Sequence, residues 1–260
     1  MTEAWVMAIG GIDPSGGAGL AVDRRSIEAA GLGCQCIVSA DTDQDDGEVR
    51  SLGARPGDVW LGECRGRVAE GLPCAVKFGL LPGREALQAA GQLVDDLLER
   101  DPDLAVVMDP VLRSSSGFEF VTSGDLPALL GLCRRPLVLT PNLAELATLT
   151  GRDPGGLPMD LDECLAAAQD LLKRGLRAVI VKDGHGQGET ICDWLCEGDG
   201  VEPKRLQRPR VRTGGGMGTI RGTGCRFASH LAAGLGLGQS LFEASLRAGD
   251  WVAEEISKGS

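Results

Sequence analysis

The sequence predicts an α/β sandwich, in which a mainly parallel sheet is covered by helices on both faces. Short runs rich in Val, Ile and Leu recur along the chain, and segments with helical periodicity lie between them. This alternation of strand and helix is typical of parallel sheets with helical crossovers. Ligands of such sheets bind beyond the carboxyl ends of the strands, so the residues that follow each apolar run are the candidates for function.

Apolar runs and helical spacing predict the individual elements in turn. The expected buried strands are residues 5–9, 34–39, 75–78, 104–108, 137–140 and 178–182. Helices are expected from about Leu20, over 87–98 and over 161–172. No linker or internal repeat divides the chain, so we expect a single domain over residues 1–260.

Helix ends are also marked in the sequence. Lys173-Arg174-Gly175 closes the pattern of 161–172, and basic residues before a glycine suit a helix C-terminus. Ser240 and Glu243 have the spacing of a capping box, which predicts the start of the last helix.

Charge and composition exclude several classes of partner. The chain has 26 basic and 37 acidic residues and a net charge of −11, which disfavours binding to nucleic acid and to anionic membranes. Aromatic residues make up only 3%, so an aromatic platform for bases is not expected. Any phosphate must therefore be bound locally, by backbone N–H groups and a few cations.

Cysteine usage and the chain start predict a cytoplasmic protein. The nine cysteines are an odd number, and several lie within apolar runs, as reduced thiols do. With two histidines and no CxxC pair, structural zinc has little support. The first residues lack the basic region of a signal peptide, and no apolar run is long enough for a membrane span.

Two glycine-rich segments could bind anions. Gly10 to Gly19 follows the first strand and precedes a helix, whose N-terminus favours anions, but it matches neither a P-loop nor a Rossmann fingerprint. Gly222-Thr223-Gly224-Cys225 opens a later helix, where converging N–H groups would form an anion hole. At that position the helix dipole is expected to lower the pKa of Cys225, although a small residue packed under the helix start is the alternative.

A third candidate is the acidic segment 41–47, directly after the second strand. It fails as a calcium loop, because the glycine is one place late and Leu52 stands where glutamate is needed. If the segment is extended, Thr42, Gln44 and Asp46 face one way and Asp41, Asp43 and Asp45 the other. Gln44 could then bind a polar ring, and an acidic surface turn is the alternative.

The order of motifs resembles one known family. The motifs are GIDPSGGAG at 11–19, Ala40 with Gln44, KFGLL at 77–81, DPVL at 109–112, TPNLAE at 140–145, VKDGH at 181–185 and GTGC at 222–225. Together they resemble the hydroxymethylpyrimidine/phosphomethylpyrimidine kinases of thiamine biosynthesis, in the ribokinase-like superfamily. The resemblance covers about residues 5 to 255 and implies a three-layer α/β/α sandwich without a separate lid, usually dimeric, that uses ATP and Mg²⁺.

The resemblance also implies roles for individual residues. The pyrimidine site is expected to include Gln44, Gly11, Asp23 and Leu80. Nucleotide and magnesium are expected near Lys182, Thr223, Asn142 and Glu145, with the metal held by Asn142 and Glu145 through water. Backbone N–H groups of Gly222 to Cys225, with Gly224 among them, would stabilise the transferring charge, and Cys225 would take the hydroxyl proton.

Several positions depart from the family pattern. Asp41 and Asp43 add charge beside Gln44, which would oppose a phosphorylated substrate. Asp183, the long Gly214 to Ile220 stretch and Arg221 before GTGC could change nucleotide contacts. Two alternatives therefore stay open beside the bifunctional pyrimidine kinase: a pyridoxal kinase of the same fold, and a non-catalytic sensor of pyrimidines or nucleotides.

Overall fold

One mixed sheet forms the centre of the computed structural model, which describes residues 4–45, 48–153, 159–182, 188–198, 200–211 and 221–258. Among these residues, nine strands run in the order β3-β2-β1-β4-β5-β6-β7-β8-β9. The strands are β1 (Trp5–Ile12), β2 (Gly33–Asp45), β3 (Glu48–Ala54), β4 (Ala75–Phe78), β5 (Ala105–Met108), β6 (Val138–Leu139), β7 (Ala178–Val181), β8 (Thr190–Glu197) and β9 (Lys204–Pro209). The helices are α1 (Gly19–Ala29), α2 (Gly57–Glu70), α3 (Gly83–Leu98), α4 (Leu126–Leu132), α5 (Leu143–Leu149), α6 (Leu161–Leu172), α7 (Thr223–Gly236) and α8 (Leu241–Lys258).

The parallel part of the sheet confirms the predicted fold class. Strands β2, β1, β4, β5, β6 and β7 are parallel neighbours. They correspond to the six apolar runs, and β4, β5, β6 and β7 are buried on both faces, as expected for strands covered by two helical layers, whereas β2 is partly buried. The order reverses at β1, whose neighbours are β2 and β4, and ligand sites of open α/β sheets lie at such switch points.

Three strands were not predicted, and all are antiparallel. β3 pairs with the second half of β2, while β8 and β9 extend the other edge. Strands β3 and β9 expose most of their side chains, so they lack the continuous apolar run that marks a buried strand. Residues 41–45 of the acidic segment are therefore extended and belong to the strand pair β2–β3.

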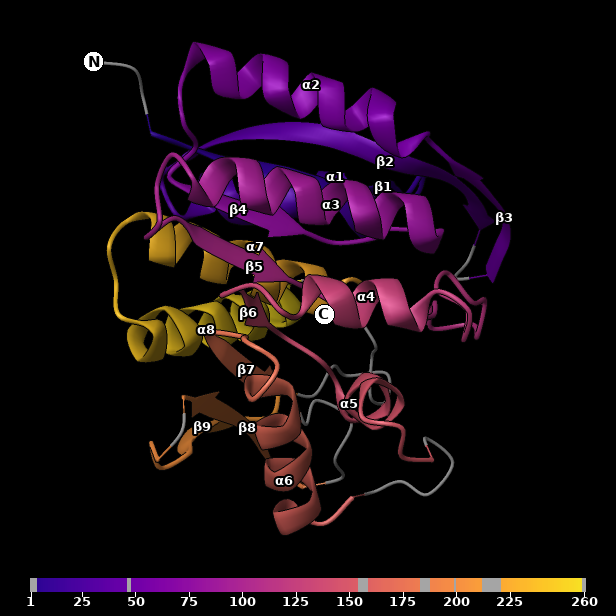
Figure 1. Ribbon diagram of the computed structural model, residues 1–260. Helices are drawn as coiled ribbons and strands as arrows, with labels where there is room; N and C mark the ends of the chain where they lie inside the picture. The colour runs from indigo at the N-terminus through magenta and orange to yellow at the C-terminus, as the bar shows by residue number, and fades with distance from the viewer. Residues whose placement is uncertain are drawn as a thin grey trace.

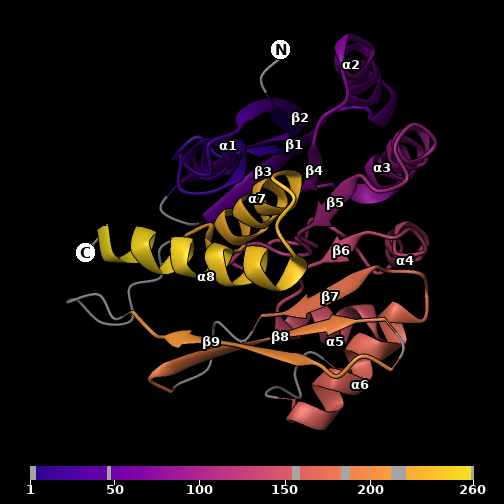
Figure 2. The ribbon, with the colours of Figure 1, turned by 90° about the vertical axis from the view of Figure 1, so that its left-hand side faces the viewer.

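Helices cover both faces of the sheet, as predicted. Figures 1 and 2 show α2, α3 and α4 on one side and α1, α7 and α8 on the other. Two separate apolar clusters fill the spaces between helices and sheet. Both are mainly aliphatic, in keeping with the composition, and Trp60 and Phe78 are the aromatic members of the largest fully buried side chains.

Helix ends agree with the local signals in the sequence. The Ser240 hydroxyl accepts from the Glu243 N–H at 3.3 Å, and the Glu243 carboxylate accepts from the Ser240 N–H at 3.2 Å, which completes the predicted capping box. Gly175 ends the turn after α6 with φ +127, and a Cβ there would lie 2.6 Å from the Arg134 carbonyl oxygen. Only glycine fits that turn. In the part of the chain that the structure describes, every helix is too short or too polar to cross a membrane.

Candidate active site

Charged residues gather where the parallel strands end. Asp109 directly follows β5 and Lys182 directly follows β7, and Lys182 Nζ lies 2.8 Å from Asp109 Oδ1. The Lys182 N–H donates to the Pro141 carbonyl at 2.9 Å, which fixes the strand end beside the loop after β6. Both side chains are largely buried, so this ion pair is held rigidly at the carboxyl edge of the sheet.

A second ion pair lies deeper in the fold. Lys77 of β4 donates to Asp23 of α1, with 2.8 Å between Nζ and Oδ1 and side-chain exposures of 1% and 0%. The Ser229 hydroxyl of α7 donates to the same Asp23 oxygen at 2.8 Å. Burial is the largest single effect and by itself would lower the Lys77 pKa, but the neighbouring negative charges, that of Asp23 first, and the hydrogen bond to Asp23 together raise it. The pair therefore joins the sheet, α1 and α7 through one carboxylate.

The N-terminus of α7 is packed against the first of these pairs. A Cβ on Gly224 would lie 3.1 Å from Asp109 Oδ2 and 3.2 Å from Lys182 Nζ. Gly222 has φ +73, and a Cβ there would lie 2.5 Å from the Gly17 carbonyl oxygen. Gly222 needs glycine because of its positive φ and the backbone oxygen so close to it, whereas a side chain at Gly224 would press against the charged ends of Asp109 and Lys182. The helix start, with its unpaired N–H groups, thus sits directly over the Lys182–Asp109 pair.

Cys225 follows these glycines in the first turn of α7, and its expected acidity is wrong. Burial raises the pKa of the Cys225 thiol to about 11, and the positive charge of Lys77 only partly offsets this effect. The helix dipole acts in the predicted direction, but the cost of burying a thiolate is larger. Cys225 is therefore a neutral thiol near pH 7.

The glycine-rich segment after β1 already holds an internal anion. Asp13 accepts hydrogen bonds from the N–H of Ser15 and of Ala18, both at 2.9 Å. Arg221 Nη2 lies 3.5 Å from the same carboxylate. The Asp13 carboxylate thus accepts two N–H groups of the turn before α1, which leaves fewer of them for a ligand anion.

Asn142 and Glu145 form a reciprocal cap at the start of α5. The Glu145 N–H donates to Asn142 Oδ1 at 2.9 Å, and the Asn142 N–H donates to Glu145 Oε2 at 2.8 Å. Burial raises the pKa of Glu145 to about 7, although the positive charge of Lys182 opposes the shift. Each side chain has one oxygen committed to the helix. Hard oxygen donors in such a position fit Mg²⁺ through its water ligands better than by direct coordination.

The structure places the residues predicted for the pyrimidine site in different surroundings. Gly11 and Leu80 are in contact, since a Cβ on Gly11 would lie 2.7 Å from Leu80 Cδ2. Asp23 is fully buried and accepts hydrogen bonds from Lys77 Nζ and from the Ser229 hydroxyl, so in this structure it positions protein groups. Its expected contact with the pyrimidine stays a prediction.

The acidic segment follows the predicted alternation where the structure describes it. Thr42 is buried and donates to the Ile12 carbonyl at 2.8 Å, whereas Asp41 and Asp43 are exposed. The two carboxylates thus lie on the opposite face of the hairpin from Thr42, which weakens their expected repulsion of a phosphorylated substrate. The Gln44 backbone pairs with Val49, and its side chain lies outside the described residues. Asp183 and the 214–220 stretch also lie outside them.

Overall, the carboxyl edge brings together Gly222, Gly224, Cys225, Lys182, Asn142, Glu145 and the first residue of α7, Thr223. Sequence reasoning gave no role to Lys77 or Asp109, which carry the two ion pairs. Both left a signal: Lys77 is a charge inside a buried strand, and Asp109 directly follows one.

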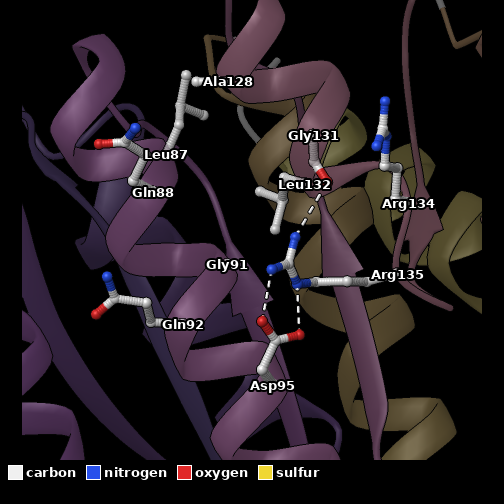
Figure 3. Close-up of a pocket in the computed structure, with 10 residues that line it drawn as sticks. All are labelled: Leu87, Gln88, Gly91, Gln92, Asp95, Ala128, Gly131, Leu132, Arg134 and Arg135. Carbon is white, nitrogen blue, oxygen red and sulfur yellow. Dashed lines mark hydrogen bonds and ion pairs between the residues drawn. The ribbon is translucent and has the colours of Figure 1, made fainter.

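A separate hollow of about 810 Å³ lies between α3 and α4 (Figure 3). It contains Arg135, which donates to both oxygens of Asp95 at 2.6 and 2.7 Å and to the Gly131 carbonyl at 3.0 Å. These charges satisfy each other, and none of the site residues lines the hollow. We therefore assign the chemistry to the carboxyl edge of the sheet.

Comparison with known proteins supports one family. The profile of the family described as phosphomethylpyrimidine kinase matches residues 13–260. The hydroxymethylpyrimidine/phosphomethylpyrimidine kinase of Rhizobium meliloti (strain 1021) is 32% identical over 255 residues, which cover 98% of this chain and 91% of the relative. The enzyme of the same name from Streptomyces coelicolor is 31% identical over 260 residues, with coverages of 100% and 91%.

Solved structures share the fold. Staphylococcus aureus pyridoxal kinase in complex with AMP-PCP and pyridoxal superposes with a TM-score of 0.82 at 25% identity, covering 98% of this chain and 88% of the other. Phosphomethylpyrimidine kinase from Clostridium difficile 630 gives a TM-score of 0.78 at 23% identity, with coverages of 98% and 100%. These likenesses confirm the ribokinase-like fold.

The buried Lys77–Asp23 pair predicts a large stability effect. Lys77→Met leaves the Asp23 charge buried and uncompensated, which should lower the free energy of unfolding by about 3–5 kcal/mol in urea titrations. The double variant Asp23→Asn/Lys77→Met should recover part of this loss. Arg65→Met, which breaks an exposed pair with Asp96 at 2.7 Å, is the control and should cost about 1 kcal/mol or less. A double variant no more stable than Lys77→Met would contradict the uncompensated charge.

Glu145 predicts a pH-dependent stability in protein free of nucleotide and metal. Its pKa is about 7 in the fold against an ordinary 4.5, so the folded state binds the proton more tightly. This contribution is present at low pH and is lost as pH rises from about 4.5 to 7, at up to about 1.4 kcal/mol per pH unit. The free energy of unfolding of wild type minus that of Glu145→Gln, which keeps the cap, should fall across this window. A flat or rising difference would contradict the prediction.

Proposed function

The chain belongs to the phosphomethylpyrimidine kinase family, and from this premise we propose that it transfers the terminal phosphoryl group of ATP to 4-amino-5-hydroxymethyl-2-methylpyrimidine and then to its monophosphate. The protein is thus a phosphotransferase of thiamine biosynthesis. The observation that carries this proposal is the packing of Gly224, at the N-terminus of α7, against the Lys182–Asp109 pair. Helix N–H groups and a lysine then face the same small space, where the charge of a phosphoryl group in transit would be stabilised.

Each residue of the edge has a part in this transfer. The N–H groups of Gly222 to Cys225 would hold the phosphoryl oxygens, and Lys182, kept in place by Asp109, would contact the nucleotide phosphates with Thr223 nearby. Burial opposes the charge on Lys182, but Asp109 and Glu145 outweigh it and raise its pKa, so it is a fixed cation. Positioned charge of this kind supplies most of the catalysis in phosphoryl transfer.

Magnesium would be held near Asn142 and Glu145 through water, where it would neutralise phosphate charge. Glu145 accepts the Asn142 N–H and is oriented by it, so the carboxylate faces Lys182 and Asp109 with a fixed geometry. Ionised Glu145 is the form that attracts a cation, and with a pKa of about 7 it is half ionised at neutral pH.

The pyrimidine would bind near the switch point of the sheet, with its ring on Gly11 and Leu80 and its polar edge on Gln44. The contact between Gly11 and Leu80 supports this position, because both lie where β1 and β4 end. In its thiolate form, Cys225 would accept the proton of the substrate hydroxyl. Lys77 favours that thiolate, and a thiol with a raised pKa gives a stronger base once it is deprotonated.

On the basis of family membership, we also propose that the chain is a single domain and that it acts in the cytoplasm as a homodimer. Sedimentation velocity tests the oligomeric state: a species of twice the chain mass is expected, and a monomer at micromolar concentration would contradict it.

Pyridoxal kinase is the second candidate, favoured by the 25% identity and TM-score of 0.82 to the Staphylococcus aureus enzyme. A coupled assay for ADP release with hydroxymethylpyrimidine, its phosphate and pyridoxal separates the candidates. We expect turnover of both pyrimidines. Turnover of pyridoxal alone would replace the pyrimidine assignment, and ligand binding without turnover of any of the three would identify a sensor.

Cys225 should be needed for turnover. Cys225→Ala is expected to lower kcat by about 10²–10⁴-fold, the usual contribution of a general base. Because the thiol pKa is about 11, log kcat of wild type should also rise between pH 8 and 10, whereas the variant should show a flat profile. Cys74→Ala, which changes a half-buried thiol on the amino-terminal side of β4, is the control. Equal kcat and equal pH profiles for Cys225→Ala and wild type would remove the proposed base.

Dependence on magnesium follows from the net charge of −11. The anion site must bind ATP against the field of the whole protein, so Lys182 and the helix N-terminus are not expected to suffice without a divalent cation. ADP release should vanish in excess EDTA and return when magnesium is added. Phosphoryl transfer that persists in EDTA would contradict the prediction.

A further inference from the structure

Two cysteines outside the site lie side by side on β2. Cys34 and Cys36 have their sulfur atoms 3.6 Å apart, and both side chains are half-buried against the apolar cluster of α1, α7 and α8. They occupy the part of β2 that pairs only with β1 among the described residues, because the pairing of β2 with β3 begins at Ala40. The thiols thus lie on the face of the sheet that α1 covers, on a stretch of β2 whose outer side pairs with no strand of the described residues.

A bond between these two sulfur atoms requires the backbone of β2 to move. Residues two apart on a strand share one face and have Cα atoms about 6.6 Å apart. This separation falls inside the range of about 4.4–6.8 Å found for disulfides, near its upper limit. The Cβ atoms of such residues point to the same side and lie about as far apart as the Cα atoms, whereas a disulfide holds them about 3.5–4.5 Å apart. Closing the bond therefore requires β2 to bend locally out of its extended form, which disturbs its pairing with β1 at Val6 and Ala8. Strained disulfides of this kind are easily reduced, so the reaction would be reversible.

The surroundings make the two thiols unequal. The hydrogen bond with Cys34 and the charge of Arg24 on α1 lower the pKa of Cys36 to about 7, although burial opposes the shift. The same hydrogen bond, together with burial, raises the pKa of Cys34. Redox-sensitive cysteines share this pattern of an accessible thiolate beside a second thiol that resolves the first oxidation product. By contrast, burial raises the pKa of Cys74.

We propose that Cys34 and Cys36 form a redox-active dithiol that a hydroperoxide oxidises to an intramolecular disulfide. The Cys36 thiolate attacks the peroxide oxygen, the O–O bond breaks, and the leaving oxygen takes a proton and departs as an alcohol or water. The sulfur is thereby oxidised to a sulfenic acid. Cys34 then attacks this sulfur, the S–O bond breaks, and water leaves with the Cys34 proton. Two thiols and one hydroperoxide give one disulfide, one alcohol (or water, when the peroxide is hydrogen peroxide) and one water.

The sequence offers a direct readout by mass. Trypsin should release residues 26–50 with Cys34 and Cys36 as the only cysteines, and residues 68–77 with Cys74 as a reference. Folded protein at pH 7.5 is treated with hydrogen peroxide, free thiols are alkylated, and both peptides are followed over time. Peptide 26–50 should lose two hydrogens and escape alkylation, at least about tenfold faster than the reference thiol is modified, and dithiothreitol should reverse the change.

Two single variants assign the roles of the thiols. In Cys34→Ser, Cys36 should gain one or two oxygens and form no disulfide, since nothing resolves the sulfenic acid. In Cys36→Ser, Cys34 should stay reduced as long as Cys74 does. Circular dichroism checks that both variants are folded.

Several outcomes would overturn the proposal: no disulfide in peptide 26–50, oxidation no faster than at Cys74, or rapid oxidation of Cys34 without Cys36. The readout is a peptide mass and not turnover, so its result is independent of the proposed kinase activity.

Discussion

Lys77 and Asp23 are both buried, and neither charge could be left in the core without the other. Lys77 is fixed by β4 and Asp23 by α1, so the pair determines how closely that helix lies against the sheet. Ser229 binds the same carboxylate from α7, which places the third element. The start of α7 is thereby brought to the carboxyl edge, where Gly224 meets Asp109 and Lys182. The proposed anion site at that edge depends on the deeper pair, because this pair links β4, α1 and α7.

Two helix N-termini face this edge, and they are used differently. The turn before α1 contains its own carboxylate, Asp13, which accepts the N–H groups of Ser15 and Ala18. Helix α7 is preceded by Gly222, and its first turn contains no acidic residue and no side-chain cap. Among the described residues, the N–H groups of that first turn are therefore open to a ligand. In the proposed function, a protein with a net charge of −11 would bind phosphate at one place, because rigid N–H groups and one fixed lysine act at short range. Burial also raises the pKa of Cys225 and of Glu145 and so favours their uncharged forms, which reduces the negative charge beside these N–H groups.

Much of the fold was predictable from sequence because it depends on short-range patterns. Continuous apolar runs identified the six parallel strands, and caps and glycines identified helix ends such as Ser240 and Gly175. The edge strands β3 and β9 were missed because they expose most of their residues, and β8, beside β9, because it is only partly buried. All three depend on antiparallel partners that no local pattern reveals. The motif order likewise led to the family and to the group around Cys225, but it gave no role to Lys77 or Asp109.

The sequence alone determined the fold class, the family and the edge of the sheet at which the chemistry lies, since these follow from periodicity and from motifs that sit at strand ends. Only the tertiary structure decided what each charged group does. Asp23, expected to bind substrate, is the buried partner of Lys77, and Cys225, expected to be acidic, is a neutral thiol. The physical reason is desolvation: the cost of burying a charge depends on neighbours 54 or more residues away in the chain, and those neighbours are set by packing.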